Sequence, residues 1–129
     1  MSTASPRRPV VLLLDDEVAL TGLLSASLGR EFEIEIAATV EEALLLLGAR
    51  KFDALLCDHM LPGGRQGLEF LVTAQQVQPS AKRILMTGYM NPELISRSTE
   101  VAGLSAVLLK PASLQEFRQV LHDALGLSA

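Results

Sequence analysis

Short apolar runs alternate with longer segments of helical periodicity along this chain, and this order constrains its fold more than any other feature. The runs are too short for stable helices, and their apolar character is typical of parallel strands that are covered on both faces. They occupy residues 10–14, 32–37, 52–57, 83–86 and 106–109. In the second run apolar residues alternate with glutamates, which favours a half-exposed strand at a sheet edge. Five successive strand–helix units predict an α/β fold: a doubly wound, five-stranded parallel sheet with helices on both faces.

Capping signals and apolar spacing predict where the helices start and which sides face the core. The capping pairs are Thr39 with Glu42, Asn91 with Pro92, and Ser113 with Glu116. The expected core positions are Leu20, Leu23, Leu24 and Leu28 in the first helix, Leu68, Leu71 and Val72 in the third, and Leu114, Phe117, Val120, Leu121, Ala124 and Leu125 in the last. The leucine run 44–47 exceeds what one helical face can bury, so it is either a contact patch or part of a crowded helix. Residues 96–99 are poor in strong helix formers, and we expect the fourth helix to be the least rigid.

Composition limits the chain to one folded domain. With 129 residues, 49% of them hydrophobic and 20% charged, the chain can bury a core. We predict a disordered tail over residues 1–8, which lack the apolar stretch of a signal peptide, and a folded domain over residues 9–127. A net charge of −4 and an aromatic content of 4% argue against nucleic-acid binding, and no segment is apolar enough to span a bilayer. The single cysteine, Cys57, forms no internal disulfide, so we expect a cytoplasmic protein.

Polar side chains follow the ends of four predicted strands, where ligands bind in open α/β sheets. These side chains are Asp15 and Asp16, then Asp58, Thr87 and Lys110. Crowded carboxylates repel one another, and a hard divalent cation such as Mg²⁺ relieves that cost. With the charge drawn off, Asp58 can attack a phosphorus centre as a nucleophile. Lys110 can then neutralise one phosphoryl oxygen, and Thr87 can donate a hydrogen bond to another.

The order of these landmarks resembles the response-regulator receiver family of two-component signalling. An acidic pair, a lone aspartate, a threonine and then Lys110–Pro111 each follow an apolar strand, and Pro62 lies in the loop after Asp58. The resemblance covers about residues 9–125 and assigns the predicted domain, residues 9–127, as a receiver domain. It implies a cis peptide bond between Lys110 and Pro111.

The resemblance also implies a role for each site residue. Asp58 is the expected phosphoacceptor, and Thr87 and Lys110 are the other expected catalytic residues. The expected ligands of Mg²⁺ or another divalent cation are Asp15, Asp16, Asp58 and the main-chain carbonyl of Met60.

Two departures from the family pattern bear on signalling. Val107 stands three positions before the lysine, where the family usually has an aromatic residue, so the usual aromatic switch is not expected. The loop 58–67, with its glycine pair 63–64, is one residue longer than usual. In addition, Met60 and Tyr89 flank the expected approach of water to a phosphorylated Asp58, which predicts a long-lived phosphoryl group.

Simpler explanations exist for several of these residues. Asp15 and Asp16 could cap the first helix, because aspartate favours helix N-termini. Glu17 is left out of the metal site, because a first-turn acid explains it. His59 is interpreted as a loop histidine without a role in chemistry, and Cys57 as an inert buried thiol.

The leading hypothesis is a signalling switch rather than an enzyme. A histidine kinase or phosphotransfer protein donates a phosphoryl group to Asp58, and the altered surface binds a downstream effector protein or a fused domain. No direct contact with nucleic acid or membrane is expected, and a homodimer through the fourth helix, fifth strand and fifth helix is an option. One alternative is an aspartyl-phosphate phosphatase or phosphotransferase, against which the adjacent first acids and the lack of a cap insertion argue. The other is a receiver-like interaction domain that does not use phosphate.

Overall fold

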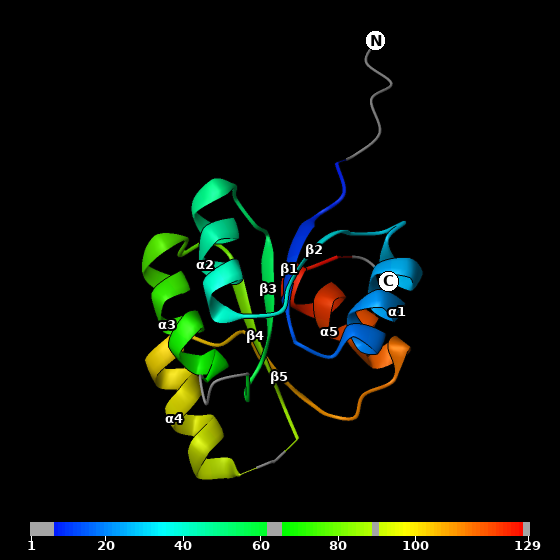
Figure 1. Ribbon diagram of the computed structural model, residues 1–129. Helices are drawn as coiled ribbons and strands as arrows, with labels where there is room; N and C mark the ends of the chain where they lie inside the picture. Colours follow the sequence, from blue (N-terminus) through cyan, green and yellow to red (C-terminus); the bar gives the residue numbers. More distant parts are fainter. Residues whose placement is uncertain (1–6, 62–65, 89–90, 128–129) are drawn as a thin grey trace.

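The computed structural model describes residues 7–61, 66–88 and 91–127, and its centre is a parallel β-sheet (Figure 1). Within these ranges five strands form one sheet in the order β2-β1-β3-β4-β5, and every neighbouring pair is parallel. The strands are β1 (Val10–Leu14), β2 (Glu33–Ala37), β3 (Ala54–Asp58), β4 (Lys82–Thr87) and β5 (Ala106–Leu109). The predicted α/β class and doubly wound architecture are confirmed, and β2 lies at an edge as predicted.

Helices cover both faces of the sheet, because its central strands are apolar on both sides. Figure 1 shows two helices on one face, α1 (Val18–Leu28) and α5 (Leu114–Leu125). The opposite face carries α2 (Val40–Ala49), α3 (Gly67–Val77) and α4 (Pro92–Ala102). Two apolar clusters fill the space between the layers, one on each face. Across the described ranges, no helix combines the length and apolar character needed to cross a membrane.

The strand boundaries follow the predictions within two residues. The strand predicted over residues 52–57 is observed as β3, from Ala54 to Asp58. Its start is later because the main-chain N–H of Phe52 donates to the Gln78 side chain (2.9 Å) and not to a neighbouring strand. Residues 106–109 form β5 as predicted. The tail over residues 1–8 stays a prediction, because residues 1–6 lie outside the described ranges; Arg7 and Arg8 are exposed.

The predicted helix caps are present to different degrees. Ser113 and Glu116 form the complete capping box of α5, and Asn91 caps α4 with Pro92 as its first helical residue. Thr39 accepts a hydrogen bond from the main-chain N–H of Glu42 (3.1 Å), which is one half of the box predicted for α2.

Two of the predicted core positions are wrong. Leu23 is 55% exposed and Leu114 is 39% exposed. Leu24 and Leu28 lie on the side of α1 that packs against the sheet. Leu23 lies outside that side, because a helix that packs on one side buries only part of its surface. Leu114 is the first residue of α5, where the helix has only begun to cover the sheet.

An ion-pair cluster joins α5 to the turn before β2. Arg118 donates two hydrogen bonds to the Glu31 carboxylate, both at 2.8 Å, and His122 Nε2 lies 3.3 Å from the same group. The hydrogen bonds from Arg118 lower the pKa of Glu31, burial opposes them, and the charge of Arg118 and the contact with His122 add to the lowering. Charged Glu31 therefore stabilises the fold above its unfolded pKa, and this stability is lost as the pH falls through the folded pKa.

We expect Glu31→Gln to lower the free energy of unfolding near neutral pH and to lose that deficit in acid. The deficit should be modest and should shrink with salt, because both partners are partly exposed. Urea unfolding of both proteins, near neutral pH and in acid, measures it. Glu100→Gln, at an exposed position of α4, is the control and should show no such pH dependence. A deficit that persists in acid would contradict the charge-based explanation.

Candidate functional site

Three carboxylates meet where β1 and β3 end. These strands pair in register, with Leu14 opposite Cys57, so the residues that follow them are neighbours. Carboxylate oxygens of Asp15, Asp16 and Asp58 all lie within 4.8 Å of one another. Asp15 is buried, Asp58 is partly buried and Asp16 is exposed, so the cluster opens outward. The sequence predicted this convergence, and the sheet order produces it.

Asp15 contacts the segment directly before α1 but does not cap this helix, whose N-cap residue is Glu17 and which has no side-chain capping hydrogen bond. Asp15 Oδ1 accepts a hydrogen bond from the main-chain N–H of Glu17 (2.9 Å), directly before α1. The other oxygen, Oδ2, faces Lys110. One carboxylate therefore holds the residue before the helix and contributes to the acidic cluster at the same time.

Lys110 brings a positive charge to the cluster from the end of β5. Its Nζ lies 2.9 Å from Asp15 Oδ2 and 3.7 Å from Asp58 Oδ2. The main-chain N–H of Lys110 donates to the Thr87 carbonyl (2.8 Å), which ties the lysine to the end of β4. The peptide bond between Lys110 and Pro111 is cis, as predicted.

The charges in this cluster shift one another's protonation. Burial raises the pKa of Asp58, and repulsion from Asp15 raises it further, while attraction by Lys110 opposes both. Burial alone would lower the pKa of Lys110, but the hydrogen bond to Asp15 and the attraction of Asp58 outweigh it and raise that pKa. The ammonium is therefore held in its charged form beside an aspartate whose pKa is raised.

An open cavity of about 290 Å³ lies over Asp58. Its lining consists of Asp58, His59, Met60, Thr87, Gly88 and Lys110. Thr87 is buried at the end of β4 and also borders this cavity. A group that enters the cavity thus meets a carboxylate, an ammonium and the end of β4 together.

The donor set fits a hard divalent cation. Three carboxylates that converge in a partly buried place repel one another, and Lys110 supplies only one positive charge. Oxygen donors of this kind suit Mg²⁺ in particular. Glu17 and His59 lie outside this group of acids, and the metal site itself stays a prediction.

Gly67 is a residue of the site that the sequence reasoning missed. A Cβ atom at this position would lie 1.9 Å from the main-chain oxygen of Asp58 and 2.6 Å from Cys57 Sγ. Its own N–H donates to the His59 carbonyl (2.8 Å), so α3 starts directly against the segment that carries Asp58. A glycine before an apolar helix is an ordinary turn signal, and nothing in its neighbours reveals this close approach.

The remaining predicted positions behave as follows. Cys57 is buried, and burial followed by the charge of Asp58 raises the pKa of its thiol, which suits an inert core residue. His59 is partly buried at the rim, and its main-chain N–H donates to the Met86 carbonyl (2.8 Å). Val107 is partly buried against the core cluster beneath α2, α3 and α4. Tyr89 and the Pro62–Gly63–Gly64 segment lie outside the described residues.

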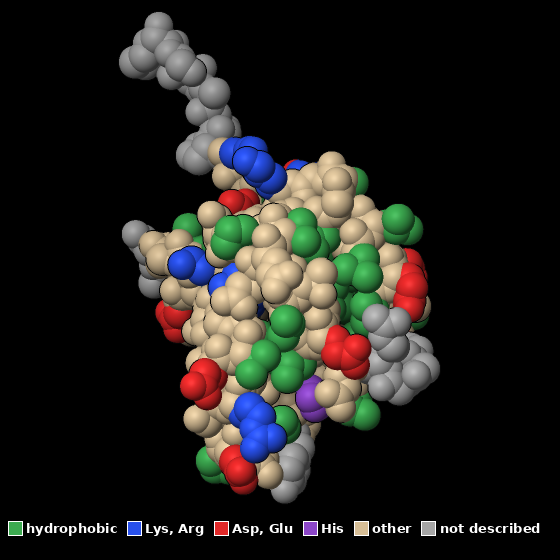
Figure 2. All heavy atoms as spheres, turned by 90° about the vertical axis from the view of Figure 1, so that its left-hand side faces the viewer, with side chains coloured by type: hydrophobic (Ala, Val, Ile, Leu, Met, Phe, Trp, Pro, Cys, Tyr) green, Lys and Arg blue, Asp and Glu red, His purple; other side chains and the backbone are tan. Residues whose placement is uncertain are grey.

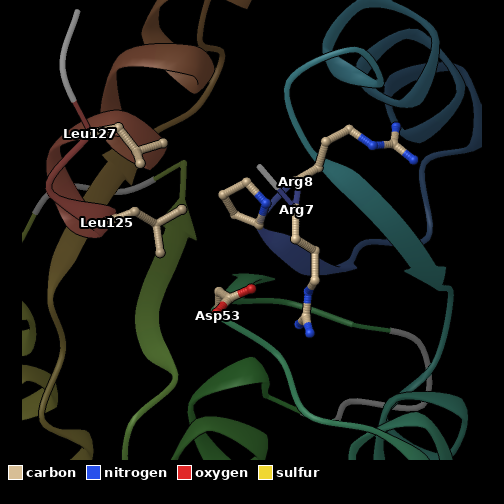
Figure 3. Close-up of a pocket in the computed structure, with 6 residues that line it drawn as sticks. Arg7, Arg8, Asp53, Leu125 and Leu127 are labelled. Carbon is tan, nitrogen blue, oxygen red and sulfur yellow. The ribbon is translucent and has the colours of Figure 1, made fainter. Parts of the chain in front are cut away.

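A larger cavity, of about 440 Å³, lies at the opposite end of the sheet. Figure 3 shows its lining: Arg7, Arg8, Pro9, Asp53, Leu125 and Leu127. Asp53 Oδ2 accepts a hydrogen bond from the main-chain N–H of Val10 (2.7 Å), and Arg8 points away from Asp53 towards the Gly29 carbonyl, to which it donates. Asp53 and Arg8 thus already make hydrogen bonds that stabilise the fold, and size alone does not make this cavity the functional site.

Comparison with known sequences identifies related proteins. The family model of the response regulator receiver domain matches residues 11–122. The hydrogenase transcriptional regulatory protein HoxA of Cupriavidus necator is 33% identical over 107 residues. These residues are 83% of this chain but 22% of that relative, and the corresponding share is 24% for the HoxA protein of Bradyrhizobium diazoefficiens. The chain thus spans about a quarter of the length of these curated relatives.

Solved structures give the same result. A CheY-like response regulator receiver domain protein from Methanospirillum hungatei superposes with a TM-score of 0.84 and 30% identity, over 93% of this chain and 95% of that one. A response regulator protein from Burkholderia pseudomallei, solved with a phosphorylated aspartic acid, a calcium ion and citrate, has a TM-score of 0.79 and 28% identity. That alignment covers 90% of this chain and 66% of the other.

Proposed function

The chain belongs to the response regulator receiver family, and from this premise we propose that it is a phosphorylation-controlled signalling switch whose acceptor is Asp58. The observation that carries the proposal is the position of Asp58, which borders an open cavity with two further acids and Lys110 around it. The Burkholderia pseudomallei relative carries a phosphorylated aspartic acid, which supports the same chemistry here.

The proposed transfer is a displacement at phosphorus. An Asp58 oxygen forms a bond to phosphorus as the bond from phosphorus to the donor breaks, and the donor leaves with that electron pair. The transferred group adds negative charge and acceptor oxygens next to Asp15 and Asp16. Lys110, 3.7 Å from Asp58, pairs with one of these oxygens, and Thr87 donates to another.

The proposal assigns the cation site to four residues. Asp15, Asp16 and Asp58 supply carboxylate oxygens, and the Met60 carbonyl supplies a further ligand. Bound Mg²⁺ would offset the charge of the acids and of the phosphoryl group. The partly open cluster leaves room for water and for phosphoryl oxygens, which Mg²⁺ prefers to a closed protein cage.

We assign the donor to a histidine kinase or phosphotransfer protein and the output to an effector. The HoxA relatives are transcriptional regulators of which this chain spans about a quarter, whereas it spans 95% of the sporulation initiation phosphotransferase F of Bacillus subtilis, so the effector is either a fused domain or a separate protein. The protein is then a switch rather than an enzyme with turnover, and its place of action is cytoplasmic. Exposed Val101 and Leu109 make α4 and β5 a candidate surface for an effector or for a homodimer that includes α5.

We expect acetyl phosphate with Mg²⁺ to add one phosphoryl group to the protein and none to Asp58→Asn, because the amide cannot act as the nucleophile. Intact-mass measurement detects the addition, and a chelator should abolish it. Asp123→Asn, at an exposed position of α5, is the matched control and should label fully. Labelling of Asp58→Asn would disprove the assignment. Absence of labelling in the unaltered protein would favour the phosphate-independent interaction domain, and continuous hydrolysis of a phosphate ester would favour the phosphatase.

A further inference from the structure

The outward face of α2 carries an apolar patch that the proposed switch does not use. Of the leucine run 44–47, Leu47 is buried, but Leu44 is 38% exposed and Leu45 is 76% exposed. Gly48 and Ala49 continue the exposed face by one turn. Figure 2 shows apolar side chains gathered on the side of the molecule that α2 and α3 form. A contiguous patch of this kind marks a surface that meets another molecule.

Charges at the two ends of α2 have opposite signs. Glu41 and Glu42 lie in its first turn, and Arg50 and Lys51 directly follow its last residue. Arg50 is paired with Glu33 (2.5 Å) within the chain, whereas Lys51 is exposed at the end of the patch. The surface therefore runs from an acidic end through an uncharged middle to a basic end.

This pattern is self-complementary under a twofold rotation. The exposed positions of α2 are 41, 42, 44, 45, 48 and 49, and all of them except position 44 are symmetric about position 45. In an antiparallel pair of α2 helices, Leu45 meets Leu45, Glu42 lies opposite Gly48, and the acidic end of each helix lies beside the basic end of the other. A parallel pair would bring equal charges together. Isologous twofold contacts require this kind of self-complementarity.

A groove next to the patch can receive the second helix. It has a volume of about 310 Å³ and is lined by Leu47, Gly48, Ala49, Arg50, Lys51, Val77 and Gln78. Val77, at the end of α3, is 55% exposed and extends the apolar surface. No atom would lie within 4 Å of a Cβ added to Gly48, so a neighbouring helix can approach closely there. The groove thus offers an apolar floor, and Lys51 at its rim can attract Glu42 of the approaching copy.

We propose that α2 is a contact surface for a second copy of this chain, which binds as an antiparallel α2–α2 pair about a twofold axis near Leu45. The second copy is favoured over an unrelated partner because the order of charges is complementary to its own reverse, and all exposed positions except 44 match their reversed order. The surface shares no residue with the cavity over Asp58, so the pairing is tested on the unphosphorylated protein. It is small, and such interfaces give weak, concentration-dependent association.

Sedimentation velocity of the unphosphorylated protein, from about 10 µM to about 1 mM, tests the pairing in the range expected for a weak interface. We expect a reversible monomer–dimer equilibrium whose Kd rises at least about tenfold in Leu45→Glu, because two carboxylates then meet at the axis. Val18→Glu is the control: Val18 is 80% exposed on α1, and its change should leave the Kd unaltered. The proposal would be overturned if the protein stayed monomeric at every concentration, or if Leu45→Glu associated with the same Kd as the unaltered protein.

Charge reversal identifies the geometry of the pair. Glu42→Lys and Lys51→Glu should each weaken association, and the double reversal should restore it, because each reversed residue again meets its opposite on the other copy. Glu42 lies in the first turn of α2 and Lys51 lies two residues beyond its last residue, so the length of the helix separates them within one chain. A double variant that stays as weak as the single variants would overturn the antiparallel arrangement.

Crosslinking through an introduced cysteine tests the position of the proposed twofold axis. Cys57 is buried, so a new surface cysteine can be followed without interference from it. Leu45→Cys should form a disulfide-linked dimer under mild oxidation, since the two copies of this residue lie together at the axis. Val18→Cys is the matched exposed control and should crosslink far more slowly. Equal rates for the two variants would contradict the position of the axis.

Discussion

Lys110→Met is expected to be less stable than the unaltered protein by about 2 to 4 kcal/mol without Mg²⁺, and to recover much of that loss when Mg²⁺ is added. Lys110 pairs with Asp15 at 2.9 Å, and Asp15 is buried. Removal of the ammonium leaves this carboxylate beside Asp58 and Asp16 with no compensating charge from the lysine. A divalent cation would supply that charge, so Mg²⁺ should stabilise the variant more than it stabilises the parent.

Urea unfolding of both proteins with and without Mg²⁺ measures this difference. The variant should also take up phosphoryl groups from acetyl phosphate about a hundredfold more slowly, because the developing charge on the phosphoryl oxygens loses its partner. Lys82→Met is the control: Lys82 is exposed at the start of β4, at the other end of the sheet, and its loss should change neither quantity. If Mg²⁺ stabilised the variant and the parent equally, the proposal that the cation can replace the positive charge of Lys110 would be wrong.

Gly67→Ala should destabilise the fold by about 3 kcal/mol and should slow phosphorylation of Asp58. The added methyl group would lie 1.9 Å from the main-chain oxygen of Asp58 and 2.6 Å from Cys57 Sγ. A main-chain oxygen cannot turn aside as a flexible side chain does, so the segment after β3 or the start of α3 must move. Either movement displaces the Asp58 carboxylate relative to Lys110.

Gly22→Ala is the matched comparison, because no atom would lie within 4 Å of its new Cβ. Gly22 lies in the middle of α1, where alanine favours the helix and should add about 0.5 to 1 kcal/mol of stability. Chemical unfolding gives both stabilities, and intact-mass kinetics gives the phosphorylation rate where Gly67→Ala remains folded by circular dichroism. A Gly67→Ala protein as stable and as rapidly labelled as Gly22→Ala would show that the close approach carries no constraint.

Sequence reasoning identifies elements best where local signals agree. Residues 106–109 are apolar, short and bounded by polar residues, and they form β5 as predicted. The capping box at Ser113 and Glu116 is complete because both residues act within one turn of α5. The start of β3 was predicted two residues too early, because the Gln78 side chain captures the N–H of Phe52 from a distant part of the chain. A local pattern contains no information about such a partner.

Candidate site residues could be predicted because the rule for open α/β sheets is general. The carboxyl ends of parallel strands share one edge, so Asp15 and Asp58 had to be neighbours once β1 and β3 paired. Their roles in phosphorylation remain a prediction. The pairing of Lys110 with Asp15, and the contact of Gly67 with Asp58, depend on the order of strands and on the distance between α3 and β3.

Local sequence signals are enough to specify the alternation of strands and helices, the polar residues at the strand ends and most of the core. These follow from the period of apolar residues and from local capping, which act over a few positions. Packing between distant parts of the chain sets the exposure of Leu23, Leu45 and Leu114. A helix buries only the side that contacts its neighbours, and those neighbours are far away in the sequence. For the same reason the α2 surface and the place of Gly67 became visible only in the folded molecule.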